Sequence, residues 1–113
     1  MGEATALEFG KEGAKVVLAD ISDKTADLAQ RMNDEGYPTI FVKTNVADEA
    51  DVKNLVDQTV AKFGKLDVMF ANAGINIEST LENLESDAWQ KVIDVNLKSV
   101  YLSDRYAIKQ FRK

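Results

Sequence analysis

Three short apolar runs alternate along the chain with segments of helical periodicity. The runs cover Lys15–Ala19, Thr39–Val42 and Leu66–Ala71, and none shows the polar alternation of a strand with one exposed face. Strands that are buried on both faces of a parallel sheet have this character. The alternation therefore predicts an α/β fold in which helices cover both faces of a parallel sheet through right-handed connections.

Helical periodicity predicts four helices, and residues suited to helix ends delimit most of them. They are Glu3–Glu12 closed by Gly13, a helix capped by Ser22 and ended by Gly36, a helix from about Asp48 to Gly64, and Ser86–Lys113. The third has the most continuous apolar stripe. The last is expected to bend at Asn96, a weak helix former. Its expected apolar face comprises Trp89, Ile93, Leu97, Val100, Ala107 and Phe111.

The side-chain inventory narrows the chemistry that the chain can perform. Its 113 residues contain no Cys and no His, which excludes thiolate nucleophiles, imidazole bases, His-ligated haem and tetrahedral zinc sites, so no metal site is expected. Acidic residues outnumber basic ones by 19 to 14 without a basic block, which argues against nucleic acid as a partner. The apolar runs are too short to span a membrane and no signal peptide is recognisable, so the expected location is the cytoplasm.

The element order predicts a single domain over residues 1–113, without a linker or an internal repeat. A doubly wound domain ordinarily opens with a strand, whereas this chain opens with a helix. We therefore expect a partial sheet of three strands, in which a strand before the first helix and the strands after the last run are missing.

Asp20 ends the first apolar run, about 20 residues after Gly2. In dinucleotide-binding folds a similar interval separates the glycine-rich turn from an acidic residue that binds ribose hydroxyls. A carboxylate there accepts hydrogen bonds from the ribose and repels a 2′-phosphate, so Asp20 favours NAD over NADP. A turn residue or a helix cap is the open alternative for Asp20.

Two motifs lie beyond the third apolar run. Ala71-Asn72-Ala73-Gly74 ends that run, and Asp94-Val95-Asn96-Leu97 follows in a helix about twenty residues later. With Glu3-Ala4-Thr5-Ala6, Gly13-Ala14-Lys15-Val16-Val17, Asn45-Val46 and Phe63-Gly64-Lys65-Leu66-Asp67, they resemble the short-chain dehydrogenase/reductase family over essentially the whole chain. The resemblance implies a partial Rossmann-type domain of an NAD(P)-dependent oxidoreductase, which interconverts an alcohol and a ketone by hydride transfer.

The resemblance also implies roles for individual residues. Asp20 would bind the adenosine ribose with Ile21 beside it, and Asn45 and Val46 would flank the adenine. The remaining cofactor-lining positions would be Gly2, Asn72, Ala73 and Gly74. Asn96 would be the catalytic candidate that holds a water in the family's proton relay, and a polar residue satisfying a helix bend is the compatible alternative.

The chain also departs from the family's pattern. Ala71 stands where the family has Asn, and Gly2 is the one glycine left of the phosphate-binding Thr-Gly-x-x-x-Gly-x-Gly. The catalytic Ser and Tyr-x-x-x-Lys would lie beyond Lys113. Two pairs could be considered in place of the Tyr-x-x-x-Lys motif. Tyr106 and Lys109 have the wrong spacing, and Tyr101 and Arg105 have the right spacing but Arg does not replace Lys. Both tyrosines are therefore expected to be packing residues of the last helix. The acidic loop from Glu78 to Glu85 would border the substrate cleft with its carboxylates in water.

These departures predict a family member truncated at both ends and inactive by itself. Val16–Ala19 and Asp67–Ala71 would then expose apolar strand edges. The resemblance implies a homo-oligomer formed through the last helix and a small alcohol or ketone as substrate, whose identity depends on a loop absent from this sequence. A non-catalytic dinucleotide-binding or assembly module remains the alternative, and a phosphoacceptor receiver domain is disfavoured.

Overall fold

The fold is organised around two parallel strands. The computed structural model describes residues 1–113 and has β1 (Val16–Asp20) and β2 (Thr39–Lys43) paired in one sheet. Val16 lies opposite Thr39 and Asp20 lies opposite Lys43, so both strands end at the same edge. β2 occupies only one side of β1, which leaves the other edge of β1 free, as the sequence predicted.

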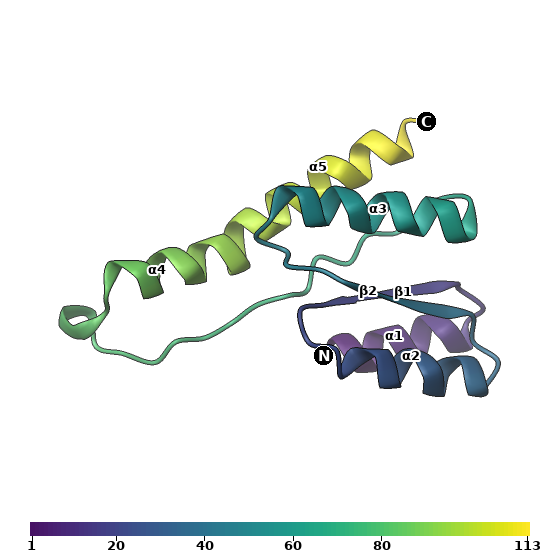
Figure 1. Ribbon diagram of the computed structural model, residues 1–113, viewed down its shortest axis with the longest axis horizontal. Helices are drawn as coiled ribbons and strands as arrows, with labels where there is room; N and C mark the ends of the chain where they lie inside the picture. Colours follow the sequence, from purple (N-terminus) through teal and green to yellow (C-terminus); the bar gives the residue numbers. More distant parts are fainter.

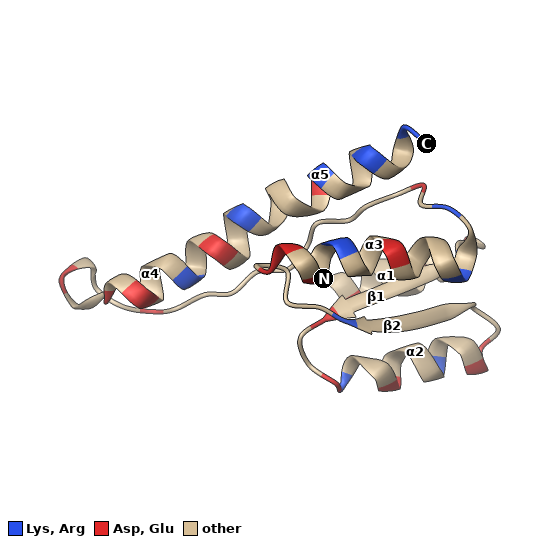
Figure 2. Ribbon diagram, turned by 45° about the horizontal axis from the view of Figure 1, so that its top comes forward, with Lys and Arg blue, Asp and Glu red and all other residues tan.

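Helices lie on both faces of this sheet, which confirms the predicted α/β class. Figure 1 shows α1 and α2 on one face and α3 on the other, with α5 alongside α3 and α4 projecting away from the sheet. Charged residues of both signs are interspersed along these helices (Figure 2). The helices are α1 (Gly2–Lys11), α2 (Thr25–Asp34), α3 (Glu49–Phe63), α4 (Ser86–Ile93) and α5 (Ser99–Phe111), with a short 3-10 turn at Leu81–Asn83.

The main core lies between the sheet and the α1–α2 layer. Met32 of α2 is fully buried there and packs with the other core members. Gly10 allows α1 to approach closely, because an added Cβ would lie 3.2 Å from Met32 Cε and Tyr37 Cβ. The full core cluster is Ala6, Leu18, Leu28, Ala29 and Met32.

α3 has the boundaries that its sequence predicts. The Asp48 side chain accepts a hydrogen bond from the Asp51 N–H at 3.0 Å, which caps the start of the helix. Gly64 ends it in the left-handed region with φ of 86°, which a residue without Cβ adopts without strain. Its buried residues are Val52, Leu55, Val56 and Thr59.

The predicted start of α2 needs correction. The helix begins at Thr25, and the Ser22 hydroxyl accepts a hydrogen bond from the Lys24 N–H at 3.3 Å instead of capping the helix. The reason is a turn over residues 21–24, in which the Asp20 carboxylate accepts from the Ser22 N–H. Asp20 therefore shapes the connection between β1 and α2.

The expected third strand, Leu66–Ala71, forms no ladder in this structure. Residues 66–71 have no regular secondary structure, and no backbone hydrogen bond joins them to another segment. A strand is stabilised by pairing, and β2 already holds the one occupied edge of β1. Val68 and Phe70 are consequently exposed in this segment.

The last helix is continuous but changes its winding where a bend was expected. A π-helical stretch, Asp94–Lys98, joins α4 to α5 and contains Asn96. Of the expected apolar face, Ala107 is buried, whereas Trp89, Leu97, Val100 and Phe111 are exposed. Besides Ala107, α5 buries Ser99, Leu102 and Ser103, and the wider π turn that precedes them shifts the register. No helix of this chain has both the length and the apolar character needed to cross a membrane.

Candidate cofactor site

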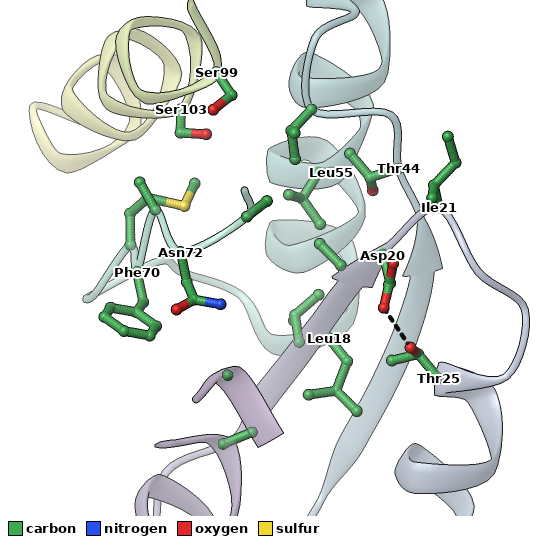
Figure 3. A pocket seen from close by; sticks show the side chains of 18 of the residues that line it. Leu18, Asp20, Ile21, Thr25, Thr44, Leu55, Phe70, Asn72, Ser99 and Ser103 are labelled. Carbon is green, nitrogen blue, oxygen red and sulfur yellow. Dashed lines mark hydrogen bonds between the residues drawn. The ribbon is translucent and has the colours of Figure 1, made fainter. Parts of the chain in front are cut away.

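One open cavity of about 1630 Å³ collects residues from distant parts of the chain. Figure 3 shows it between β1, α3, the segment around Asn72, and α5, which carries Ser99 and Ser103. It is lined by all eight positions that the sequence suggested for the cofactor: Gly2, Asp20, Ile21, Asn45, Val46, Asn72, Ala73 and Gly74. The fold thus brings together residues that lie up to 72 positions apart in the sequence, from Gly2 to Gly74.

Asp20 is held at the carboxyl end of β1. Its backbone carbonyl accepts a hydrogen bond from the Thr44 N–H at 2.8 Å, which continues the strand pairing by one residue. Its carboxylate accepts from the Ser22 N–H at 3.2 Å and from the Thr25 hydroxyl at 2.7 Å (Figure 3). No basic side chain forms an ion pair with Asp20, because Lys43 places its Nζ 3.2 Å from Asp23.

Asn45 and Val46 lie on the turn between β2 and α3. The Asn45 N–H donates to Asp51 Oδ2 at 2.8 Å, and its side-chain Oδ1 accepts from the Ala47 N–H at 3.0 Å. The first turn of α3 therefore fixes this loop, and the Asn45 side-chain N–H₂ is left without a partner in the chain. Val46 is half-buried at the cavity wall, and Ile21 is largely exposed beside Asp20.

Gly2 and Asn72 meet at the start of α1. A Cβ at Gly2 would lie 2.9 Å from Asn72 Nδ2, so the absence of a side chain allows this approach. Gly74 occupies a similar position against the last helix, where an added Cβ would lie 3.4 Å from Asn96 Oδ1. The Asn72–Gly74 loop is thus placed between the N-terminus of α1 and the π-helical stretch.

Asn96 fastens that loop through its side chain. Its Oδ1 accepts from the Ile75 N–H and its Nδ2 donates to the Ile75 carbonyl, each at 2.8 Å. The two bonds use one donor and one acceptor of the Asn96 side-chain amide, so this side chain holds the backbone of the loop at Ile75. Both bonds go to the loop and not to the backbone of the helix, so the water-holding role and the bend-satisfying alternative both stay predictions.

The tyrosines of α5 do not reach the cavity. Neither Tyr101 nor Tyr106 lines it, and neither do Arg105 and Lys109. Tyr106 donates its hydroxyl to Glu49 Oε1 at 2.9 Å, and this hydrogen bond is the main cause that raises the pKa of the Tyr106 hydroxyl. Tyr106 thus packs against α3 as expected, whereas Tyr101 is more than half exposed and accepts from Arg105.

Some site features were not anticipated from the sequence. Thr25 holds the Asp20 carboxylate, and the Ile75 backbone is held by Asn96. The available sequence signals were the place of Thr25 five residues after Asp20 and that of Ile75 directly after Gly74. The carboxylates of the acidic loop are exposed, as expected, but residues 76–85 do not line the cavity. No group of three or more acidic side chains in this chain could hold a metal ion.

The fold is an α/β domain in which polar residues gather beyond the carboxyl ends of parallel strands. The sequence profile of the family described as short chain dehydrogenase matches residues 1–113. The chain belongs to the short-chain dehydrogenase/reductase family.

Relatives support this assignment at the level of sequence and structure. The chain is 38% identical over 110 residues to a cis-4-hydroxycyclohexanecarboxylate dehydrogenase of Sinomonas cyclohexanicum, which covers 96% of this chain and 44% of that protein. It is 38% identical over 112 residues to short chain aldehyde dehydrogenase 1 of Euphorbia lathyris. That match covers 96% of this chain and 38% of the relative. A short-chain dehydrogenase/reductase double mutant of Serratia marcescens superposes with a TM-score of 0.90 at 29% identity, covering 96% of this chain and 45% of that one. The chain thus spans less than half the length of these relatives.

Proposed function

We propose that these 113 residues are the NAD-binding part of an oxidoreductase that interconverts an alcohol and a ketone. The observation that carries the proposal is that eight motif positions line one cavity, which extends along β1 and past the carboxyl ends of β1 and β2. The region beyond these carboxyl ends is where open α/β sheets bind their ligands. The family assignment adds weight, because nicotinamide dinucleotides are this family's general cofactors.

The residues present fit the adenosine half of such a cofactor. Asp20 offers a carboxylate with remaining acceptor capacity for ribose hydroxyls, since each oxygen has two lone pairs and uses one. Asn45 offers a free side-chain N–H₂ beside Val46 for the edge and face of the adenine. A negative and cation-free Asp20 repels a 2′-phosphate, which is why we propose NAD rather than NADP.

Fewer residues of this chain would contact the pyrophosphate than the adenosine half of the cofactor. Gly2 begins α1, whose first N–H groups point toward the cavity end of the helix and suit an anion. Asn72, Ala73 and Gly74 would line the central part of the cofactor from the opposite side. When bound, the cofactor supplies the hydride-carrying nicotinamide.

Turnover needs a group that exchanges a proton with the substrate oxygen. None of the chain's three tyrosines lies at the cavity, and the chain has no His to replace them. We therefore expect the 113-residue chain to bind NAD without reducing it in the presence of an alcohol. Formation of NADH by the purified chain would favour a site other than the one proposed.

The proposed site can be mapped by titrating NAD into the isotopically labelled chain and following the backbone amides by NMR. We expect the largest shifts at Gly2, Asp20, Asn45, Ala73 and Gly74. Glu82 and Asp57 lie outside the cavity and serve as internal controls. Shifts confined to residues outside the cavity, or none at millimolar NAD, would contradict the proposed function.

We also propose that the last helix forms a homo-oligomer interface. Its solvent-facing apolar residues are Trp89, Leu97, Val100, Tyr101, Ile108 and Phe111. An Ile108→Glu substitution should lower the oligomeric fraction in analytical ultracentrifugation, whereas Leu81→Glu, which changes an apolar residue that is 89% exposed in the distant loop, should not. Equal sedimentation of the unchanged chain and the Ile108 variant would contradict this interface.

A further inference from the structure

Both oxygens of the Asp20 carboxylate are held by the segment that follows β1. Oδ1 accepts from the Ser22 N–H at 3.2 Å and Oδ2 accepts from the Thr25 hydroxyl at 2.7 Å. The first donor belongs to the backbone of a turn and the second to a side chain at the start of α2. We propose that Thr25 is a positioning residue that fixes the Asp20 carboxylate and thereby sets the preference for NAD over NADP. This inference rests on the proposed function.

The Thr25 hydroxyl has no other structural task. Thr25 is the first residue of α2, and the helix has no side-chain cap, so its hydroxyl is not used to satisfy the helix N-terminus. Asp20 is the single hydrogen-bond partner of the Thr25 hydroxyl, and Thr25 is half-buried. A short hydrogen bond to an ionised carboxylate is of the stronger kind and restrains its orientation.

The Thr25 hydroxyl is an uncharged donor, and this matters for the cofactor preference as much as its position does. A Lys or Arg at this place would orient the carboxylate but would also offset its charge and attract a phosphate. Thr25 orients Asp20 while leaving its negative charge intact. The one cation opposite Asp20 in the strand pairing, Lys43, is directed to Asp23 instead. The oriented Asp20 carboxylate can therefore both accept hydrogen bonds from the ribose hydroxyls of NAD and repel the 2′-phosphate of NADP.

Removal of the Thr25 hydroxyl should loosen this arrangement without removing the carboxylate. In a Thr25→Val variant, Asp20 keeps the Ser22 N–H as its one remaining donor and can rotate about its side-chain bonds. NAD binding then requires ordering of that side chain, and a rotated carboxylate repels a 2′-phosphate less. We expect NAD to bind about fivefold more weakly and NADP to bind no more weakly, so that the ratio of their dissociation constants shifts by about fivefold toward NADP.

The experiment measures dissociation constants for NAD and for NADP by isothermal titration calorimetry on the full 113-residue chain. Thr25→Ser retains the hydroxyl and should restore the preference. Ser22→Ala is the matched control, because it removes the hydroxyl that accepts from Lys24 but keeps the backbone N–H that donates to Asp20. An unchanged ratio in the Val variant, or an equal change in the Ser variant, would overturn the proposal.

A second readout does not depend on the cofactor. NMR couplings report whether the Asp20 side chain occupies one rotamer, and amide spectra report whether each variant is folded. We expect one rotamer in the unchanged chain and in Thr25→Ser, and rotamer averaging in Thr25→Val. A single rotamer in the Val variant overturns the positioning role, whereas absence of NAD binding by the unchanged chain overturns the proposed function. The two failures are therefore distinguishable.

Discussion

Asn96 and Ile75 are joined by two hydrogen bonds of 2.8 Å that pair a side-chain amide with a backbone amide. The pairing spans 21 residues and connects the π-helical stretch of the last helix to the loop that ends in Gly74. π-Helical turns inside α-helices are frequent at functional sites. Here the turn places Asn96 against the loop that lines the candidate cofactor cavity.

An Asn96→Ala substitution should free this loop. Each lost hydrogen bond is exposed and contributes about 0.5–1 kcal/mol to local stability, so the overall fold should persist. The amide of Ile75 should lose most of its protection against hydrogen exchange. Asn54→Ala is the control, since Asn54 is an exposed asparagine of α3 without a side-chain hydrogen bond. Equal protection of Ile75 in the unchanged chain and in the Asn96 variant would refute the fastening role.

Met32 should dominate the stability of the α1–α2 layer. It is fully buried in the core cluster, and a Met32→Ala substitution leaves a cavity bounded by α1, α2 and β1. The expected loss is about 3 kcal/mol in the free energy of unfolding, measured by urea titration. Leu81→Ala, at a side chain that is 89% exposed, should change it by less than about 0.5 kcal/mol. A Met32 variant as stable as the Leu81 variant would contradict the described core.

Alkaline pH should weaken the contact between α3 and α5. The hydrogen bond to Glu49 raises the pKa of Tyr106 above its ordinary value of 10.0, so the protonated hydroxyl is favoured in the folded chain. Its stabilising contribution is present below the unfolded pKa and is lost as pH rises through the higher folded pKa. Unfolding measured between about pH 9 and 12 should show this loss in the unchanged chain and a smaller one in Tyr106→Phe. Identical pH profiles would show that the Tyr106–Glu49 bond does not contribute.

Local sequence signals predicted most of the elements correctly. α3 was delimited by Asp48 and Gly64, whose capping chemistry acts within a few residues. The family motifs pointed to eight positions that all line the cavity, and their roles toward a cofactor stay predictions.

The features that depend on distant neighbours were not predictable in this way. Leu66–Ala71 has the composition of a buried strand, but strand formation depends on a partner and none lies beside it here. The buried face of α5 follows from the π turn at Asn96, which changes the register by an amount that periodicity does not reveal. The bond between the Thr25 hydroxyl and the Asp20 carboxylate also needs the turn that brings the two groups together, and the residue types alone do not reveal that turn.

The central claim is that Asp20 selects the cofactor of this site, and its replacement by a cation tests that claim most directly. Dissociation constants for NAD and NADP are measured for the unchanged chain and for Asp20→Arg, with Asp27→Arg as a control at an exposed carboxylate of α2 that lies outside the cavity. We predict that the unchanged chain and the Asp27 variant bind NAD more tightly, and that the Asp20 variant binds NADP more tightly. The same ratio of the two constants in all three proteins would contradict the assignment of Asp20 to the ribose.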